Sequence, residues 1–204
     1  MVNRARPTTA LVLIDLQMGL AGTPVGAEPQ PLAALVAERG VLAAAAGALG
    51  LSRERSLEIV HVRLAFDAAY ANRTNRTARF DDHEAAGRFS SDSDAAQFCR
   101  EVAPIPGELV LDKGSVSAFA STILERTLRA RGVRRLVLGG VATHLAVESA
   151  AREAADRGFE VIVLEDVCAA PPALHEHSIT QTIPLFAQVV DTSGLGHRLD
   201  AVTR

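Results

Sequence analysis

Residues 136–170 read LVLGGVATHLAVESAAREAADRGFEVIVLEDVCAA, and this stretch decides the fold class. Its apolar beginning predicts a strand at Arg135–Leu138, and a second apolar run predicts a strand at Phe159–Leu164. Between them, His144–Arg157 has the amphipathic pattern of a helix, and Gly158 is a typical helix stop. Short continuous apolar runs suit strands that are buried on both faces, as in parallel sheets. The strand–helix–strand unit therefore predicts an α/β fold with parallel strands.

The same alternation continues on both sides of this unit. Apolar runs predict four more strands, at Thr9–Leu16, Leu57–Arg63, Glu108–Leu111 and Ala187–Asp191. Further helices are predicted at Pro31–Leu49, Ser121–Ala130 and Pro172–Phe186. We therefore predict a single α/β domain over residues 1–204, in which right-handed crossovers place helices on both faces of a mostly parallel sheet.

Composition limits the classes of partner. The 204 residues include 21 Lys and Arg against 24 Asp and Glu, a net charge of −3, so no basic field favours nucleic acid. The two cysteines, Cys99 and Cys168, exclude a disulfide framework and a four-cysteine zinc site. No apolar run approaches the roughly 18 residues of a membrane span, and the run near the N-terminus is too short for a signal peptide. We expect a complete cytoplasmic protein without a membrane or nucleic-acid partner.

One long segment, Phe66–Pro106, breaks the alternation, since it has no clear strand and is rich in Asn, Arg, Asp and Ser. Irregular segments of about forty residues are uncommon in compact domains and often form lids or binding loops. The alternative is a surface excursion with a short helix near Ser93–Cys99. Arginines in the segment are candidates for binding an anionic substrate: Arg73, Arg76, Arg79 and Arg88. Candidate pocket walls are the aromatic residues Phe66, Tyr70, Phe80 and Phe89, together with Phe119 beyond the segment.

Polar residues follow several predicted strands, at the carboxyl edge where open α/β sheets bind ligands. Asp15 ends the first strand, Lys113 follows the third, residues 139–144 (GGVATH) lead from the fourth into a helix, and Glu165 and Asp166 end the fifth. A carboxylate at such an edge can act as a general acid or base, and a neighbouring ammonium can orient it. Backbone amides at a helix start can receive negative charge that develops on oxygen. We predict that the charged groups of Asp15 and Lys113 lie within direct or one-water hydrogen-bond reach.

Together these residues resemble the isochorismatase-like (cysteine hydrolase) superfamily over nearly the whole chain. The resemblance rests on residues 136–170 and on ALVLIDLQMGL (10–20), IVHVR (59–63) and LDKGSVSAF (111–119). It implies a six-stranded parallel sheet of order 3-2-1-4-5-6 and a hydrolase that acts on a small molecule. It also implies assembly into a homodimer or a higher homo-oligomer.

The resemblance assigns roles to particular residues. The family has a triad of Asp, Lys and Cys, of which Asp15 and Lys113 match the first two. The Val141–Ala142 bond matches a cis peptide found in many members, and the amides of Ala142 and Ala146 match the donors of an oxyanion or anion site. The expected substrate pocket contains Gln17, Phe119, Val141, Thr143 and His144.

The chain departs from this pattern at the nucleophile, because Ala146 occupies the position of the catalytic cysteine. The thioester route of the family's amidases is then closed at this site, and Cys168 is expected to pack as a small apolar side chain. True isochorismatases hydrolyse a vinyl ether without a thiolate, and His144 is shared with them, whereas Thr143 resembles the amidases. Three hypotheses follow: a hydrolase using an Asp15/Lys113 acid–base pair, with an enol ether as one possible substrate; a catalytically silent small-molecule binding homologue; or an amidase inactivated, naturally or by engineering, through Cys-to-Ala replacement at position 146.

The histidines do not indicate a metal site. Nicotinamidases of the superfamily carry Asp-x-His after the second strand, which HVRLAFD (61–67) lacks. His175 and His177 flank Glu176 but do not have the HExxH spacing. We expect His61 in the sheet or core, His83 and His177 in solvent, and His175 at a helix start. We expect neither a metal nor another cofactor.

Overall fold

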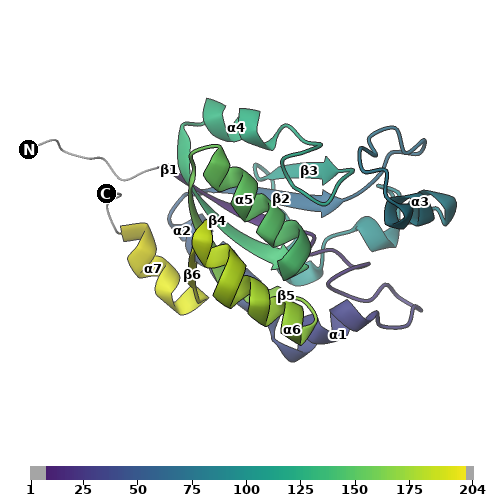
Figure 1. The fold of residues 1–204 in the computed structure, drawn as a ribbon, viewed down its shortest axis with the longest axis horizontal. Helices are drawn as coiled ribbons and strands as arrows, with labels where there is room; N and C mark the ends of the chain where they lie inside the picture. Colours follow the sequence, from purple (N-terminus) through teal and green to yellow (C-terminus); the bar gives the residue numbers. More distant parts are fainter. Residues whose placement is uncertain (1–7, 201–204) are drawn as a thin grey trace, which may run out of the picture.

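A computed structural model describes residues 8–200 and contains a sheet of six parallel strands (Figure 1). The strand order is β3-β2-β1-β4-β5-β6, so both the α/β class and the strand order are confirmed. The strands are β1 Thr8–Ile14, β2 Glu58–Leu64, β3 Leu109–Lys113, β4 Val133–Val141, β5 Glu160–Ala169 and β6 Gln188–Val190. All six predicted strands are present, with ends that differ by a few residues.

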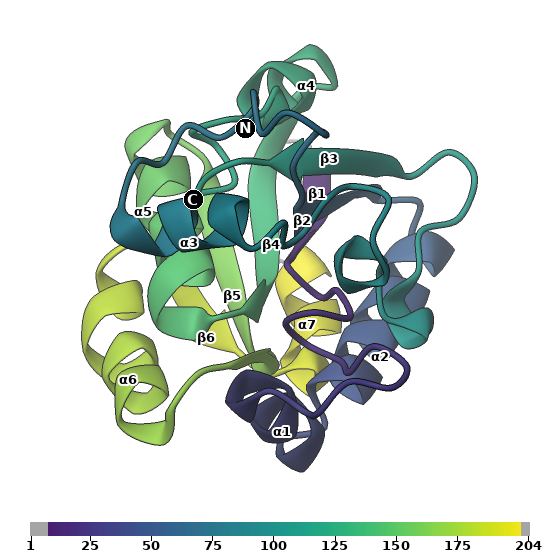
Figure 2. The ribbon, with the colours of Figure 1, turned by 90° about the vertical axis from the view of Figure 1, so that its right-hand side faces the viewer.

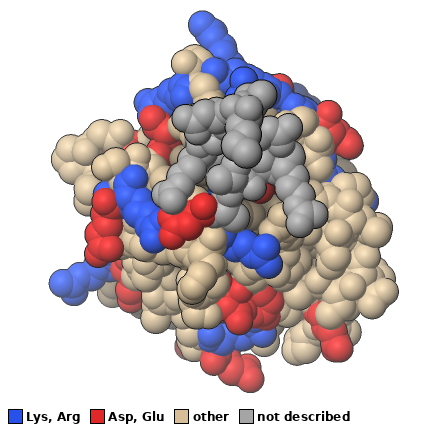
Figure 3. Space-filling view, turned by 90° about the vertical axis from the view of Figure 1, so that its left-hand side faces the viewer, with Lys and Arg blue, Asp and Glu red and all other residues tan. Residues whose placement is uncertain are grey.

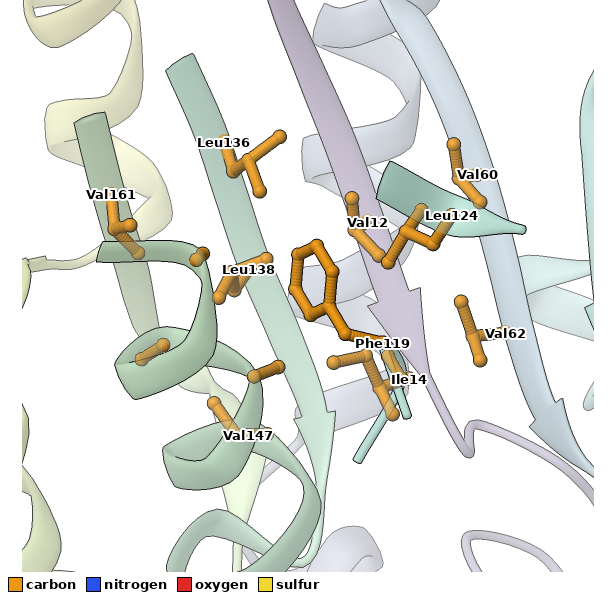
Figure 4. Close-up of a cluster of buried hydrophobic side chains, with 14 of the residues drawn as sticks. Val12, Ile14, Val60, Val62, Phe119, Leu124, Leu136, Leu138, Val147 and Val161 are labelled. Atoms are coloured by element: carbon orange, nitrogen blue, oxygen red, sulfur yellow. The ribbon is translucent and has the colours of Figure 1, made fainter. Parts of the chain in front are cut away.

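Helices cover both faces of the sheet. Their bounds are α1 Pro31–Glu38, α2 Val41–Glu54, α3 Ala78–Ala85, α4 Leu124–Ala130, α5 Glu148–Asp156, α6 Pro172–His177 and α7 Thr192–Asp200. One apolar core joins the sheet to α1, α2 and α7, and a second joins it to α4, α5 and the turns after α6. Figure 4 shows the second core, in which side chains of β1, β2, β4 and β5 meet those of α4 and α5.

Three predicted helices differ from the structure. The helix expected at Pro31–Leu49 is two helices bent by 62°, because Gly40 ends the first in the left-handed region with a φ of 67°. The helix expected at Pro172–Phe186 is α6 followed by a π-turn and a 3-10 turn, since Pro184 lacks an amide hydrogen. The helix expected from His144 begins with a π-turn, Thr143–Val147, before α5. The short α7, which contains two glycines, was not predicted.

The long segment Phe66–Pro106 contains α3 and packs around an aromatic cluster of its own. Phe66 stacks on Tyr70 with ring centroids 4.8 Å apart and meets Phe80 edge-to-face at 6.2 Å. Phe80 and Phe89 are both buried, so the cluster fixes α3 against the end of the sheet. The short helix expected near Ser93–Cys99 is a single 3-10 turn.

The surface carries charges of both signs. On the face shown in Figure 3, basic and acidic side chains lie next to one another, which agrees with the small net charge of −3. In residues 8–200, no single helix is long and apolar enough to cross a membrane. The bent pair of α1 and α2 meets the length and composition criteria only when the two helices are taken together.

Candidate active site

Three segments that are far apart in the sequence meet at the carboxyl edge of the sheet, which faces the viewer in Figure 2. Asp15 directly follows β1, Lys113 is the last residue of β3, and the turn Val141–Ala142 follows β4. Helix α3 lies across this edge (Figure 2). The parallel strand order brings these residues together because β1 lies between β2 and β4 at the switch point.

Asp15 and Lys113 form a buried ion pair. The Lys113 Nζ lies 2.8 Å from the Asp15 Oδ2, and the two side chains are 2% and 5% exposed respectively. Lys113 also donates a hydrogen bond of 2.9 Å to the Ser115 carbonyl oxygen. The second carboxyl oxygen, Asp15 Oδ1, is buried and has no hydrogen-bond partner in residues 8–200. The predicted proximity of the two charged groups is confirmed, and one carboxyl oxygen is left for another molecule.

The backbone aims the Asp15 side chain out of the strand. Asp15 has a φ of 60°, which is uncommon for a residue with a side chain, and its amide donates a 2.8 Å hydrogen bond to the Val62 carbonyl oxygen. Gly140 lies beside it with a φ of 139°, and a Cβ there would meet the Ile14 carbonyl oxygen at 2.0 Å. Only glycine at position 140 therefore allows β4 to approach the end of β1 this closely.

Burial shifts the protonation of the Asp15 carboxyl. Removal from water raises the pKa of the Asp15 carboxyl above its usual 3.8, although the charge and hydrogen bond of Lys113 act in the opposite direction. The carboxyl is therefore a better proton donor near neutral pH than an exposed aspartate. This is the property that a general acid requires.

The turn after β4 forms a second wall of the site. The Val141–Ala142 peptide is cis, as the resemblance implied. Val141, Ala142 and Ala146 line a cavity of about 40 Å³ together with Asp15 and Lys113. The structure thus places both predicted anion-site residues and the expected nucleophile position beside the ion pair, with a methyl group at position 146.

This small cavity adjoins a larger groove of about 830 Å³. The two share six wall residues, which connect the ion pair to the outside: Leu20, Leu32, Arg79, His83, Ala142 and Leu145. The groove is lined mainly by the segment after β1, by α1 and by α3. The groove therefore leads along α3 to the small cavity whose wall contains Asp15.

The remaining predicted pocket residues are distributed differently. His144 lines the groove, whereas Gln17, Thr143 and Phe119 lie on the wall of neither the cavity nor the groove. Gln17 is fully buried, and its amide bridges the backbone of Leu64 and Ala95. Phe119 points into the apolar core over the sheet, because Phe159 lies beside it with ring centroids 6.4 Å apart (Figure 4). The structure gives Gln17 and Phe119 packing positions instead of pocket positions.

Thr143 belongs to a buried hydrogen-bond chain that sequence reasoning did not find. Its Oγ1 lies 2.8 Å from the His175 Nδ1, and the His175 Nε2 lies 2.9 Å from the Glu165 Oε1. Arg39, at the end of α1, forms an ion pair with the same Glu165. Because Thr143 is fully buried, this hydroxyl is not accessible to a substrate, and the chain ties the turn after β4 to α6 and β5. The sequence pointed to Thr143, His175 and Glu165 one by one, but not to their contact, and Glu165 lies within β5 instead of at its end.

The structure corrects the prediction for His83 of α3, and it distinguishes Arg79 of the same helix from the other three candidate arginines. His83 is 8% exposed, so the prediction that it lies in solvent is wrong: the rings of Phe80 and Phe89 enclose it at centroid distances of 5.6 and 5.1 Å. Arg79 is the one arginine, of the four proposed for anion binding, that lines the small cavity as well as the groove. Arg73 instead pairs with Asp81 and Glu84 at 2.5 and 2.8 Å. His61 lies buried in β2, as expected.

Both cysteines are free and buried, and neither lines the cavity or the groove. Burial raises the pKa of the Cys99 thiol to about 11 and that of the Cys168 thiol to about 12. Neither is therefore a thiolate near neutral pH. In the described part of the chain, no three His, Cys, Asp or Glu side chains are arranged to hold a metal ion.

Comparison with known proteins shows the family of this chain. The model of the isochorismatase domain matches residues 9–194, and the chain therefore belongs to the isochorismatase family. It is 32% identical over 183 residues to the uncharacterised isochorismatase family protein YecD of Escherichia coli O157:H7, covering 89% of this chain and 91% of that protein. A solved isochorismatase family protein from Desulfovibrio vulgaris superposes with a TM-score of 0.82 at 25% identity, over 96% of this chain and 100% of the other.

Some relatives carry the name of an amidase. The chain is 30% identical over 171 residues to the ureidoacrylate amidohydrolase RutB of Variovorax paradoxus, covering 78% of this chain and 67% of that protein. The match to RutB of Methylorubrum extorquens is 42% identical over 92 residues, and it spans only 37% of that relative's length.

Proposed function

We propose that this protein is a small-molecule hydrolase of the isochorismatase family that uses Asp15 as its general acid and base and has no cysteine nucleophile. One observation carries the proposal: Asp15 offers a buried Oδ1 at a cavity with no hydrogen-bond partner among residues 8–200, while Lys113 holds its other oxygen at 2.8 Å. A carboxyl with a raised pKa is suited to donate a proton, and the adjacent ammonium stabilises the carboxylate that remains.

An enol ether is the substrate type that fits a site without a thiol. The Asp15 proton adds to the enol carbon, and the ether carbon becomes an oxocarbenium ion. Water then adds to that carbon and returns a proton to the Asp15 carboxylate. The resulting hemiketal breaks its carbon–oxygen bond, its hydroxyl proton passes to the leaving oxygen, and an alcohol and a carbonyl compound are released. We assign Ala142 and Ala146 to the wall beside the leaving oxygen, on which negative charge develops as the hemiketal carbon–oxygen bond breaks, because both residues line the cavity beside Asp15.

A second candidate is an amidase that has lost its nucleophile. The identity of 30% to a relative named ureidoacrylate amidohydrolase favours it. Under this hypothesis the cavity, the ion pair and the turn are retained, and only the sulfur is missing at position 146. A catalytically silent binding protein would retain the same features and hydrolyse nothing.

Restoring the sulfur distinguishes these functions. The unaltered protein and Ala146→Cys are each assayed with isochorismate and with a panel of small amides. The new thiol would line the cavity near Lys113, and a neighbouring ammonium favours the thiolate, so it should alkylate rapidly. Ser149→Cys, a half-buried position three residues further along, is the matched control for a thiol that does not line the cavity.

The proposed function predicts enol-ether hydrolysis by the unaltered protein and no amide turnover by Ala146→Cys. Amide hydrolysis by Ala146→Cys, with an acyl adduct detected by mass spectrometry, would establish the amidase alternative. Loss of both activities in a correctly folded protein would leave the binding function. The native gene at codon 146 decides whether the alanine is natural. Self-association and a cytoplasmic location remain predictions of the sequence.

A further inference from the structure

Arg79 is a cation without a partner at the entrance to the site. It lies in α3 and is exposed, and within residues 8–200 its side chain makes no hydrogen bond or ion pair. It lines both the small cavity and the groove. The cavity wall contains two further charged side chains, Asp15 and Lys113, and these neutralise each other. Arg79 is therefore the charged side chain of this wall that has no hydrogen bond or ion pair within residues 8–200.

His83 provides an independent second observation. It lies one helical turn after Arg79 on the same face of α3 and also lines both spaces. The histidine is more than nine-tenths buried, yet neither ring nitrogen has a hydrogen-bond partner in the part of the chain that the structure describes. Buried polar atoms are normally paired, so two orphaned nitrogens at a cavity indicate a place for a polar ligand atom.

Both groups suit the same ligand atoms. Burial, and then the nearby charges of Arg79 and Arg88, lower the pKa of His83, so the ring is neutral near pH 7 and offers one N–H donor. A guanidinium presents a planar fork of donors that matches a carboxylate. The groove is also lined by the carboxylates of Glu28 and Asp82, which do not line the small cavity, so an anion is favoured at the inner end, next to Arg79.

We propose that Arg79 and His83 form a carboxylate-binding subsite, and that the substrates of this protein are small carboxylates. The guanidinium of Arg79 binds the carboxylate, and the His83 ring donates a hydrogen bond to it. This inference rests on the proposed function for the location of the reacting bond at Asp15. Since Arg79 and His83 line the same cavity of about 40 Å³ as Asp15, the carboxylate lies only a few bonds from the reacting atoms.

Crotonate and crotonamide test the subsite by binding alone, without any need for turnover. The two molecules have nearly the same shape, and only crotonate is charged. Their dissociation constants are measured by ligand-observed NMR for the unaltered protein, Arg79→Gln, Arg79→Lys and Arg76→Gln. Arg76 is the matched control, because it belongs to the same segment, is exposed and lines neither space.

Arg79→Gln should weaken crotonate binding by about 10- to 100-fold and leave crotonamide unchanged, because a charge-assisted hydrogen-bond pair is lost. Arg79→Lys should retain part of the affinity, and His83→Phe, which preserves the packing, should weaken crotonate binding by about 3- to 10-fold. Equal crotonate affinity in the unaltered protein and Arg79→Gln would overturn the proposal. Equal weakening by Arg76→Gln, or no saturable binding of crotonate to the unaltered protein, would overturn it as well. None of these outcomes depends on catalysis. The hydrolase assignment is tested separately, by the turnover assays.

Discussion

Two buried carboxylates near opposite ends of the sheet have opposite pKa shifts. Asp15, at the carboxyl end of β1, has a raised pKa, whereas the pKa of Glu108, immediately before β3, is lowered to about 2. Burial raises the pKa of both carboxyls. At Glu108, hydrogen bonds from Arg53, the Ile105 amide and His61 outweigh burial.

The difference lies in the number of donors. Both oxygens of Glu108 are occupied: Arg53 Nε lies 2.7 Å from Oε1, and His61 Nε2 lies 2.8 Å from Oε2. At Asp15, one oxygen pairs with Lys113 and the other has no hydrogen-bond partner in residues 8–200. A carboxylate with both oxygens bonded stabilises the fold, and one that lacks a donor beside a cavity is available for chemistry.

Removing the Asp15 carboxyl should have the largest effect. Asp15→Asn keeps the size of the side chain but cannot donate or accept the proton, so turnover should fall by about 10²- to 10⁴-fold. In the unaltered protein, the acid form of Asp15 is lost as pH rises through its raised pKa, so kcat/KM should decline on the alkaline side of a pKa above 3.8. Steady-state rates across pH measure both effects.

Glu108→Gln is the control for this substitution, because it removes the charge of the other carboxylate. It should leave turnover unchanged at temperatures where the protein is folded. If the turnover rate of Asp15→Asn were within a few-fold of that of the unaltered protein, the catalytic role of Asp15 would be contradicted.

The pair of Asp15 and Lys113 was partly predictable from the sequence. Asp15 and Lys113 were found because apolar runs located β1 and β3, and parallel strands bring their carboxyl ends together. Glu108 was absorbed into a predicted strand, since nothing local shows that Arg53 and His61 converge on it. Such convergence is a long-range contact, which periodicity does not contain.

The helix α3 shows the other limit of sequence reasoning. Its mean hydropathy is low and it lies in an irregular segment, so neither its existence nor the burial of His83 was predicted. His83 is buried because Phe80 and Phe89 enclose it, and Phe89 follows α3. Phe119 was assigned to the pocket by resemblance, although its ring packs in the core.

A smaller effect is expected on stability at Glu108. The carboxyl has a lower pKa in the folded state than its usual 4.5, so it stabilises the fold above that value, and the stabilisation is lost as pH falls towards about 2. Glu108→Gln should reduce the free energy of unfolding by about 1–3 kcal/mol at pH 7, because charge-assisted hydrogen bonds are weakened. The difference between the two proteins should shrink between pH 4.5 and pH 2.

Urea unfolding at several pH values measures this effect. Glu101→Gln, at an exposed position in the 3-10 turn that precedes β3, should change the free energy of unfolding by less than about 0.5 kcal/mol. If the deficit of Glu108→Gln were the same at pH 7 and pH 3, the loss would come from packing instead of charge, and the contrast with Asp15 would disappear.

The smallest effect is expected at the cysteines, whose buried thiols can be compared with the two carboxyls. The Cys99 and Cys168 thiols have pKa values raised to about 11 and about 12, so the thiolate is scarce at pH 7.5. Cys99→Ser and Cys168→Ser should therefore leave turnover nearly intact, and iodoacetamide should not inactivate the unaltered protein.

Ala146→Cys should become alkylated far faster than either native thiol, because its sulfur would face the cavity near Lys113. Stoichiometric inactivation of the unaltered protein, mapped to Cys168 by mass spectrometry, would place a reactive thiol in the active site. Asp15 would then no longer be sufficient to explain the chemistry, since a nucleophile would be present after all.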